Sequence, residues 1–277
     1  MQTAFAPSPD QTAHAWDRVV ESYESGFEPF TNRFAADALE LLGVDACTRL
    51  LDVATGPGGL TIAALNRGAE VTAIDFSPRM IAHLRRRLSN EQRWRTSAVV
   101  MDGQNLALPA ATFDAACSIF GLIFFPDPAR GLREMHRVLK PGGRAAIAAW
   151  SDPRRHEALR LIQQVLCEVW PAFRPPAAPP PWLCYQNPDS LRAALAATGF
   201  TAVEVHTVTH TWEIPSVDWF LANIPSLSPG TDFLFHAMGP EIAEAFAAAL
   251  ATRLQQRFGD GPVSLSAEAH LGLGRKR

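Results

Sequence analysis

The sequence predicts a doubly wound α/β domain with a mostly parallel seven-stranded sheet, an N-terminal helical flap and helical cap insertions in the C-terminal half. Between residues 49 and 150, short apolar runs alternate with amphipathic stretches of helical periodicity. A glycine-rich turn follows the first run, and acidic residues lie at the ends of the first three runs. Strands separated by helices need crossover connections, which make the sheet parallel and place helices on both of its faces.

The elements of this central region follow one another in a regular order. The third helix is expected to end at Pro141-Gly142-Gly143, and Pro78 is allowed in the first turn of the second. Strands are predicted at 49–55, 70–75, 97–103, 112–122 and 144–150, and helices at 59–68, 78–88 and 129–140.

The two ends of the chain have a different pattern. Helices are predicted at 12–24, 31–42 (ending at Gly43), 151–170 and 189–198, strands at 200–214 and 264–276, and a helical insert at 216–257. The proline-rich segment 173–182 is expected to form an extended strap, because proline interrupts regular structure. We therefore divide the chain into a disordered tail (1–11), a helical flap (12–46), a core (47–150), a helical and proline-rich cap insert (151–199), and the last strands with a second insert (200–277).

Composition excludes several classes of protein. The 277 residues carry a formal charge of −3, which provides no broad positive field for nucleic acid, and the cluster Arg85 to Arg87 fits a solvated helix face. The four cysteines are widely spaced and form no C-x-x-C pair, so neither a metal site nor a disulfide framework is predicted. No apolar run approaches the roughly 20 residues that span a bilayer, and the N-terminus has no signal-peptide pattern. We expect a cytoplasmic protein without a membrane span.

The most informative stretch is LLDVATGPGGL at 50–60. Gly56 and Gly58 allow the backbone to turn tightly after a strand and to approach a ligand where a Cβ would clash. In open α/β sheets, ligands bind outside the carboxyl ends of such strands. A purely structural turn between strand and helix is the alternative interpretation.

Acidic residues end three successive strands. Asp52 lies four residues before Gly56, where its carboxylate can meet an amine or a water molecule. Asp75 suits a bidentate contact with the two hydroxyls of a ribose, and Asp102, with the Gly-Gln that follows it, can face an adenine. Each acid alone could instead cap a helix or a turn. Together, around one crevice, they favour a nucleoside-binding site.

A nicotinamide dinucleotide site is the main alternative for this turn. Such a site requires G-x-G-x-x-G, but the position three residues after Gly58 is Thr61. Asp52 would also repel a pyrophosphate. A carboxylate before the glycines favours a ligand with positive groups and no phosphate, such as the ammonium and sulfonium of S-adenosylmethionine.

Four stretches together resemble the Rossmann-like (class I) S-adenosylmethionine-dependent methyltransferases, especially the subgroup that includes the ubiquinone and menaquinone C-methyltransferases. They are LLDVATGPGG (50–59), AIDFSPRMI (73–81), MDGQNLALPAATFD (101–114) and LREMHRVLKPGGRAAIAAW (132–150). The segment 15–30 is also similar to the one that folds over the cofactor in this family. The resemblance implies an antiparallel last strand, S-adenosylmethionine as cofactor and S-adenosylhomocysteine as product.

The resemblance also assigns residues to the parts of this cofactor. Asp52, Ala54, Gly56 and Gly58 would hold the methionine portion, and Asp75 would bind the ribose hydroxyls. Phe76 and Met80 would lie against the adenine or ribose, and Asp102, Gly103 and Gln104 would hold the adenine end. Ser118 and Phe120 would face the methionine and the transferred methyl group, and Tyr23 would contact the carboxylate, unless it only packs.

Two departures from the family pattern bear on the chemistry. Ala54 replaces a common glycine, and GLIFFPD (121–127) makes the substrate side apolar and removes an obvious acid–base group. Methyl transfer from a sulfonium needs mainly alignment, so a general base matters only for an acceptor that arrives protonated. His210 and His236 are weak candidates for that base, and His206 is more simply structural. No catalytic residue is assigned.

Large aromatic residues between 170 and 238 predict a small, hydrophobic or aromatic methyl acceptor, although most of them are expected to pack the insert. Three alternatives stay open: a non-methyl-transfer reaction on the same cofactor and fold, a non-enzymatic protein with a degenerate pocket, and an NAD-dependent oxidoreductase. The methylated atom and the oligomeric state, monomer or homodimer, are also open.

Overall fold

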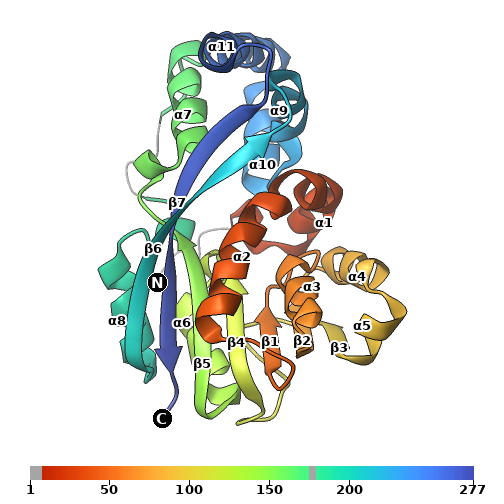
Figure 1. Cartoon of the computed structure of the whole chain (residues 1–277). Helices are drawn as coiled ribbons and strands as arrows, with labels where there is room; N and C mark the ends of the chain where they lie inside the picture. Colours follow the sequence, from red (N-terminus) through yellow and green to blue (C-terminus); the bar gives the residue numbers. More distant parts are fainter. Residues whose placement is uncertain (1–7, 175–178) are drawn as a thin grey trace.

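The computed structural model describes residues 8–174 and 179–277, and its centre is a seven-stranded sheet in the order β3-β2-β1-β4-β5-β7-β6 (Figure 1). β7 is antiparallel to both of its neighbours, β5 and β6, and the other six strands share one direction. This confirms the predicted doubly wound fold with an antiparallel last strand. The strands are β1 (Arg49–Val53), β2 (Glu70–Asp75), β3 (Thr96–Val100), β4 (Phe113–Ile119), β5 (Leu139–Trp150), β6 (Thr201–Ile214) and β7 (Val263–Arg275).

Helices cover both faces of the sheet, with α2, α3 and α4 on one face and α6 and α8 on the other (Figure 1). Strands covered on both sides are buried along their length, which explains why β1 is a continuous apolar run apart from the acid near its end. The helices are α1 (Ala13–Ser22), α2 (Glu28–Leu42), α3 (Gly59–Asn66), α4 (Pro78–Arg87), α5 (Asn90–Trp94), α6 (Pro128–Val138), α7 (Glu157–Val169), α8 (Pro188–Thr198), α9 (Val217–Asn223), α10 (Pro229–Met238) and α11 (Pro240–Phe258).

Helix ends follow local chemistry in most places. α2 ends at Gly43, which has a φ of +62°, and the Ser77 hydroxyl caps α4 by accepting from the amide of Met80 at 3.0 Å. The end of α6 differs from the prediction, because α6 stops at Val138 and the Pro-Gly-Gly stretch lies inside β5. A register shift between β4 and β5 accommodates these extra residues.

The N-terminal segment is more ordered than predicted. Residues 1–7 lie outside the described residues, but Pro9–Gln11 form a 3₁₀ turn instead of continuing a disordered tail. The indole nitrogen of Trp16 donates to the carbonyl of Asp10 at 2.8 Å and so holds this turn against α1. The expected break between the first two helices is instead a π-helical turn, Tyr23–Phe27, which joins α1 to α2.

β6 and β7 continue past the end of β5 and form a two-stranded ribbon, which leads to a group of helices at the top of Figure 1. The second insert, α9 to α11, connects the two strands, and α7 packs against α11. Within the predicted strap 173–182, residues 175–178 lie outside the described part, and Pro181–Leu183 form a 3₁₀ turn.

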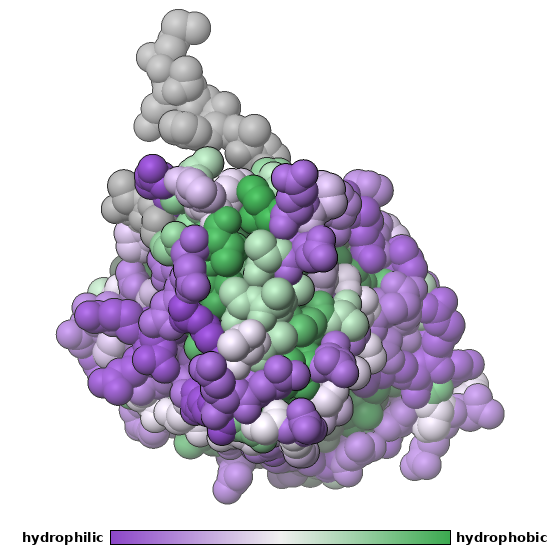
Figure 2. All heavy atoms as spheres, turned by 90° about the horizontal axis from the view of Figure 1, so that it is seen from above, coloured by the Kyte–Doolittle hydropathy of each residue, from purple (hydrophilic) through white to green (hydrophobic). Residues whose placement is uncertain are grey.

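Seen from the insert end, apolar side chains gather in the middle of the surface and polar side chains surround them (Figure 2). Of the described helices, not one has the length and apolar character to cross a bilayer. Of the large aromatic residues of the insert, Phe220 and Phe246 are fully buried, Trp219 and Phe235 are partly buried, and Phe233 is exposed. The buried ones therefore stabilise the packing of the insert.

Candidate functional site

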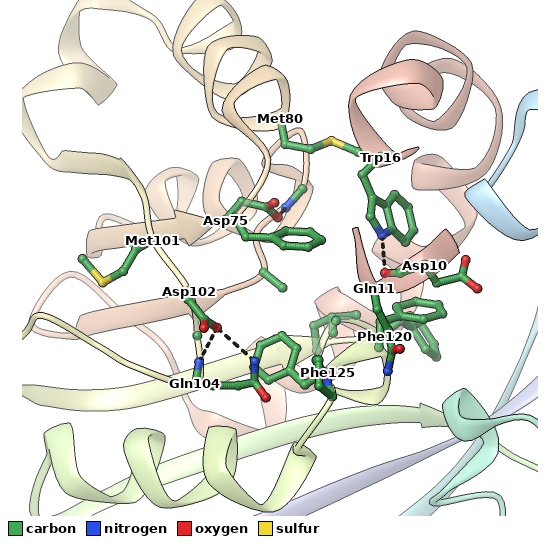
Figure 3. A pocket seen from close by; sticks show the side chains of 18 of the residues that line it. Asp10, Gln11, Trp16, Asp75, Met80, Met101, Asp102, Gln104, Phe120 and Phe125 are labelled. Carbon is green, nitrogen blue, oxygen red and sulfur yellow. Dashed lines mark hydrogen bonds between the residues drawn. The ribbon is translucent and has the colours of Figure 1, made fainter. Parts of the chain in front are cut away.

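A cavity of about 330 Å³ lies at the carboxyl ends of β2, β3 and β4, beneath the N-terminal segment (Figure 3). This is where ligands bind in open α/β sheets, and the volume is at the lower end of the range for small-molecule sites. The predicted cofactor residues that line it are Tyr23, Ala54, Gly56, Asp75, Phe76, Met80, Asp102, Gly103, Gln104 and Phe120.

The turn after β1 needs residues in the left-handed region. Ala54 and Gly56 have φ values of +57° and Gly58 has +100°. A Cβ on Gly58 would lie only 2.3 Å from Cδ1 of Leu84 in α4. Gly58 does not line the cavity, so in this structure it holds the turn close to α4 instead of facing a ligand.

Gly58→Ala is expected to lower the free energy of unfolding by about 2–4 kcal/mol, because it adds a clash to the strain of a left-handed alanine. Gly199→Ala is the matched control: Gly199 has a φ of +103°, but its added Cβ would lie 3.5 Å from the nearest atom, Nε2 of His136. The control should cost only about 1–2 kcal/mol. Urea unfolding of both variants measures the difference, and equal losses would contradict the role given to Leu84.

Asp52 is the most deeply buried acid near the turn. Its Oδ2 accepts hydrogen bonds from Oγ1 of Thr55 at 2.6 Å and of Thr61 at 2.7 Å, and burial raises the pKa of Asp52 to about 6. It faces a side chamber of about 40 Å³, which Tyr23 and Asn32 also line, and not the main cavity. Within the described part of the chain, no cationic side chain lies within 4 Å of this carboxylate. A positively charged ligand group such as an ammonium fits this chamber.

Asp75 closes β2 and fixes the turn. Its Oδ2 accepts from the amide of Gly56 at 2.9 Å and its Oδ1 from the amide of Ser77 at 2.9 Å. Each oxygen keeps a second lone pair for a ligand. Burial raises the pKa of Asp75 to about 6, and the carboxylate lies at the cavity wall (Figure 3). Two fixed acceptors side by side suit the adjacent hydroxyls of a ribose.

The wall beyond β3 is built around Asp102. Its Oδ1 accepts from the backbone amide of Gln104 at 2.8 Å and from the side-chain amide at 3.2 Å (Figure 3). Gly103 allows close packing here, since a Cβ would lie 2.5 Å from Cζ of Phe125. These groups lie at the cavity wall at the end of β3, where they can contact a flat base.

Two further predicted residues occupy different positions. Phe120 lines the cavity with a φ of +56° and stacks on Trp150, with ring centroids 3.8 Å apart. Ser118, expected to face the methyl group, is fully buried behind the wall, where its Oγ accepts from the amide of Leu122 at 3.0 Å. Its role in this structure is to hold the turn after β4.

Tyr23 lies between the main cavity and the side chamber. Its hydroxyl is 3.5 Å from Oγ1 of Thr31, and burial raises the pKa of Tyr23 above its ordinary value. The phenol therefore stays protonated at neutral pH, and it can donate a hydrogen bond to a ligand carboxylate.

None of the candidate histidines lies at the cavity. His210 pairs with Asp37, with 2.7 Å between Nε2 and Oδ2, and its ring packs edge-on against Phe34. His206 pairs with Glu204, and His236 is exposed on α10, where its Nδ1 is 2.7 Å from a backbone carbonyl. The suggestion that His210 or His236 serves as a base at this cavity is therefore not supported by their positions.

Several lining residues were not predicted. Asp10 and Gln11 come from the segment expected to be disordered, and Trp16 from the start of α1. Phe124 and Phe125 belong to the stretch 121–127, whose apolar composition indicated an apolar substrate side without singling out these two residues. The aromatic residues at 170–238, from which an aromatic acceptor was predicted, do not line this cavity. Among the described residues, no group of three or more histidine, cysteine or acidic side chains could hold a metal ion.

Comparisons with known proteins agree with this geometry. A family model described as "Methyltransferase domain" matches residues 51–147. The chain is 30% identical over 182 residues to a demethylmenaquinone methyltransferase of Thermus thermophilus, covering 61% of this chain and 81% of the relative. It is 30% identical over 212 residues to the ubiquinone/menaquinone biosynthesis C-methyltransferase UbiE of Geotalea daltonii, covering 72% and 89%.

A similar solved structure is phosphoethanolamine N-methyltransferase 2 of Haemonchus contortus in complex with S-adenosyl-L-methionine. The TM-score is 0.56 at 18% sequence identity, covering 94% of this chain and 57% of the other. At this identity the likeness concerns the fold.

Proposed function

Since this chain belongs to the class I S-adenosylmethionine-dependent methyltransferases, near the ubiquinone and menaquinone C-methyltransferases, we propose that it methylates a small, uncharged, hydrophobic or aromatic acceptor. The comparisons give no support to an oxidoreductase.

The observation that carries the proposal is the charge of the cavity wall. Apolar and aromatic side chains make up most of the lining, and its described residues include three acids, Asp10, Asp75 and Asp102, but no lysine, arginine or histidine. An anionic acceptor would lose its hydration there and gain no cationic partner. An uncharged aromatic acceptor can instead pack against Trp16, Phe120 and Phe124.

The residues of the cofactor end are proposed to act as follows. Asp75 binds the ribose hydroxyls, Asp102 and Gln104 hold the adenine end, and Asp52 attracts the ammonium through the side chamber. The phenol O–H of Tyr23 donates a hydrogen bond to the ligand carboxylate. When bound, the cofactor supplies an electrophilic methyl group on a positively charged sulfur.

The contribution of the protein to the reaction is then alignment. Holding two reacting groups at about 3 Å in the correct orientation can lower a barrier by roughly 7–11 kcal/mol. Among the described residues, no histidine lines the cavity to remove a proton, so the acceptor must be nucleophilic in itself or readily ionised. Electron-rich aromatic carbons and the more acidic phenols have this property.

Binding of two matched ligands tests the acceptor class. With the S-adenosylhomocysteine complex, 2-naphthol is expected to bind at least about tenfold more tightly than 6-hydroxy-2-naphthoate, which adds one carboxylate to the same ring system. Calorimetric titration measures both constants. Equal affinity, or tighter binding of the carboxylate, would contradict the proposal. Formation of S-adenosylhomocysteine during turnover separates methyl transfer from other reactions of the cofactor.

A further inference from the structure

Helix α10 of the second insert contributes no residue to the cavity lining, yet it is fastened to the segment that covers the cavity. This segment, residues 9–16, is called the roof here, because Asp10, Gln11 and Trp16 all line the cavity from it. The roof and α1 both pack against α10. The insert is thus connected to the site through the roof.

Asp10 makes the first connection. Its side chain is buried, and its carboxylate lies against the first turn of α10, where a Cβ added at Gly230 would be 3.6 Å from both carboxylate oxygens. Figure 3 shows this carboxylate pointing away from the cavity, while the carbonyl of the same residue accepts from the Trp16 indole at 2.8 Å. One residue therefore holds both the aromatic side chain over the cavity and the first turn of the insert helix.

The energetics of this contact depend on its position at a helix N-terminus. Burial raises the pKa of Asp10 to about 6, although the Gly230 amide opposes the rise, so the carboxylate is ionised at neutral pH. A negative charge is stabilised at the N-terminus of a helix, where backbone amides are not used within the helix. In this position the amides offset part of the cost of burying the charge, and loss of the Asp10 side chain would remove the contact between the roof and α10.

An ion pair makes the second connection. Arg18 in α1 pairs with Asp232, which also lies in the first turn of α10. On the opposite side, α1 is held to α4, where Asp17 accepts from the hydroxyl of Ser77 at 2.5 Å and Arg79 pairs with Glu21. The roof is therefore held from two sides, by the core through α4 and by the insert through α10.

We propose that Asp10 and Arg18 are positioning residues that hold the roof closed against α10, so that release of this contact sets the rate at which the cofactor product leaves the cavity. The insert then affects the site indirectly, because α10 holds in place the roof that covers the cavity. The effect on release of the cofactor product rests on the proposed function. The contact between the roof and α10 does not.

Amide hydrogen exchange of the ligand-free protein tests the fastening directly. The amides of Gln11, Thr12 and Trp16 are hydrogen-bonded within the roof. Their exchange is expected to rise about tenfold in Asp10→Ala and about threefold in Arg18→Gln, since the buried Asp10 side chain packs against α10 whereas the Arg18 ion pair is half exposed. Exchange in β1 and β2 should not change. Arg253→Gln is the matched control, because it breaks an ion pair between α11 of the same insert and Glu168 of α7, away from the roof.

The dissociation rate of S-adenosylhomocysteine, measured by stopped flow, is the second readout. It should rise by about the same factors, with a smaller change in the association rate, and Asp10→Asn should lie between wild type and Asp10→Ala because it keeps one acceptor oxygen. Wild-type roof exchange and wild-type release in both Asp10→Ala and Arg18→Gln would overturn the inference. If Asp10→Ala does not fold, Asp10→Asn and Arg18→Gln decide. If the wild type does not bind S-adenosylhomocysteine, the proposed site is wrong, and the exchange experiment still tests the fastening.

Discussion

Replacing Asp75 with alanine is expected to weaken S-adenosylmethionine binding at least about 100-fold, because two charge-assisted hydrogen bonds at about 1.5–3 kcal/mol each are lost with the carboxylate. The same change removes the acceptors of the Gly56 and Ser77 amides, so the turn that approaches the ligand is also released. Calorimetric titration of wild type and variant measures the effect, and NAD is expected to bind to neither.

Asp75→Asn distinguishes ligand contact from loop support. Asparagine keeps one acceptor oxygen for a backbone amide but offers one acceptor fewer to a ribose and carries no charge. We expect a loss of affinity between those of wild type and Asp75→Ala, with a melting temperature close to wild type. An alanine variant that binds the cofactor as tightly as wild type would remove Asp75 from the site.

Asp52→Asn is expected to change stability and affinity in opposite directions. The pKa of Asp52 is raised from 3.8 to about 6 by burial, so the ionised form is disfavoured in the folded, ligand-free protein. At about 1.4 kcal/mol per unit of pKa, ionisation costs the folded state about 3 kcal/mol at pH 8. The variant should therefore be more stable than wild type by up to about 3 kcal/mol at pH 8, and bind S-adenosylmethionine at least about tenfold more weakly.

The stability difference between Asp52→Asn and wild type is expected to depend on pH. The favourable contribution of a carboxyl with a raised pKa is fully present below its unfolded value of 3.8 and is lost as the pH rises through about 6. The stability difference between Asp52→Asn and wild type should thus shrink as the pH falls from 8 toward 4. Urea unfolding at several pH values checks this. Asp189→Asn, which removes an exposed carboxylate, should change stability by no more than about 0.5 kcal/mol.

The part of the cavity at the ends of β1, β2 and β3 could be predicted because its signals are local in the sequence. A strand that must be buried on both faces is apolar without interruption, so an acid near its end, such as Asp52 or Asp75, stands out. Positive φ values at the turn require small residues, which explains the glycines. These positions are set by a few neighbouring residues, and the parallel sheet then brings the strand ends together.

The other side of the cavity could not be predicted, because distant packing determines it. Asp10 is ordered by Trp16 and by α10, more than 200 residues further along the chain. His210 was a candidate base because it is a histidine. In the structure its Nε2 pairs with Asp37 of α2, a contact that the sequence does not indicate. The aromatic residues of the insert resemble a ligand pocket in composition, but Phe220 and Phe246 are buried in the core and none of these residues lines the cavity. Composition alone does not distinguish the two.

Topologically, the whole segment 215–262 is the loop of one β-hairpin. The last pair of the β6–β7 ribbon joins Ile214 to Val263, so the segment leaves and re-enters the sheet at a single rung. Loop-closure entropy grows only slowly with length, and a change in loop length does not shift the register of the strands that flank it. A chain of this design can therefore lengthen, shorten or exchange everything beyond that rung, and so alter how its site is covered, while the pairing that places Asp52 and Asp75 stays the same.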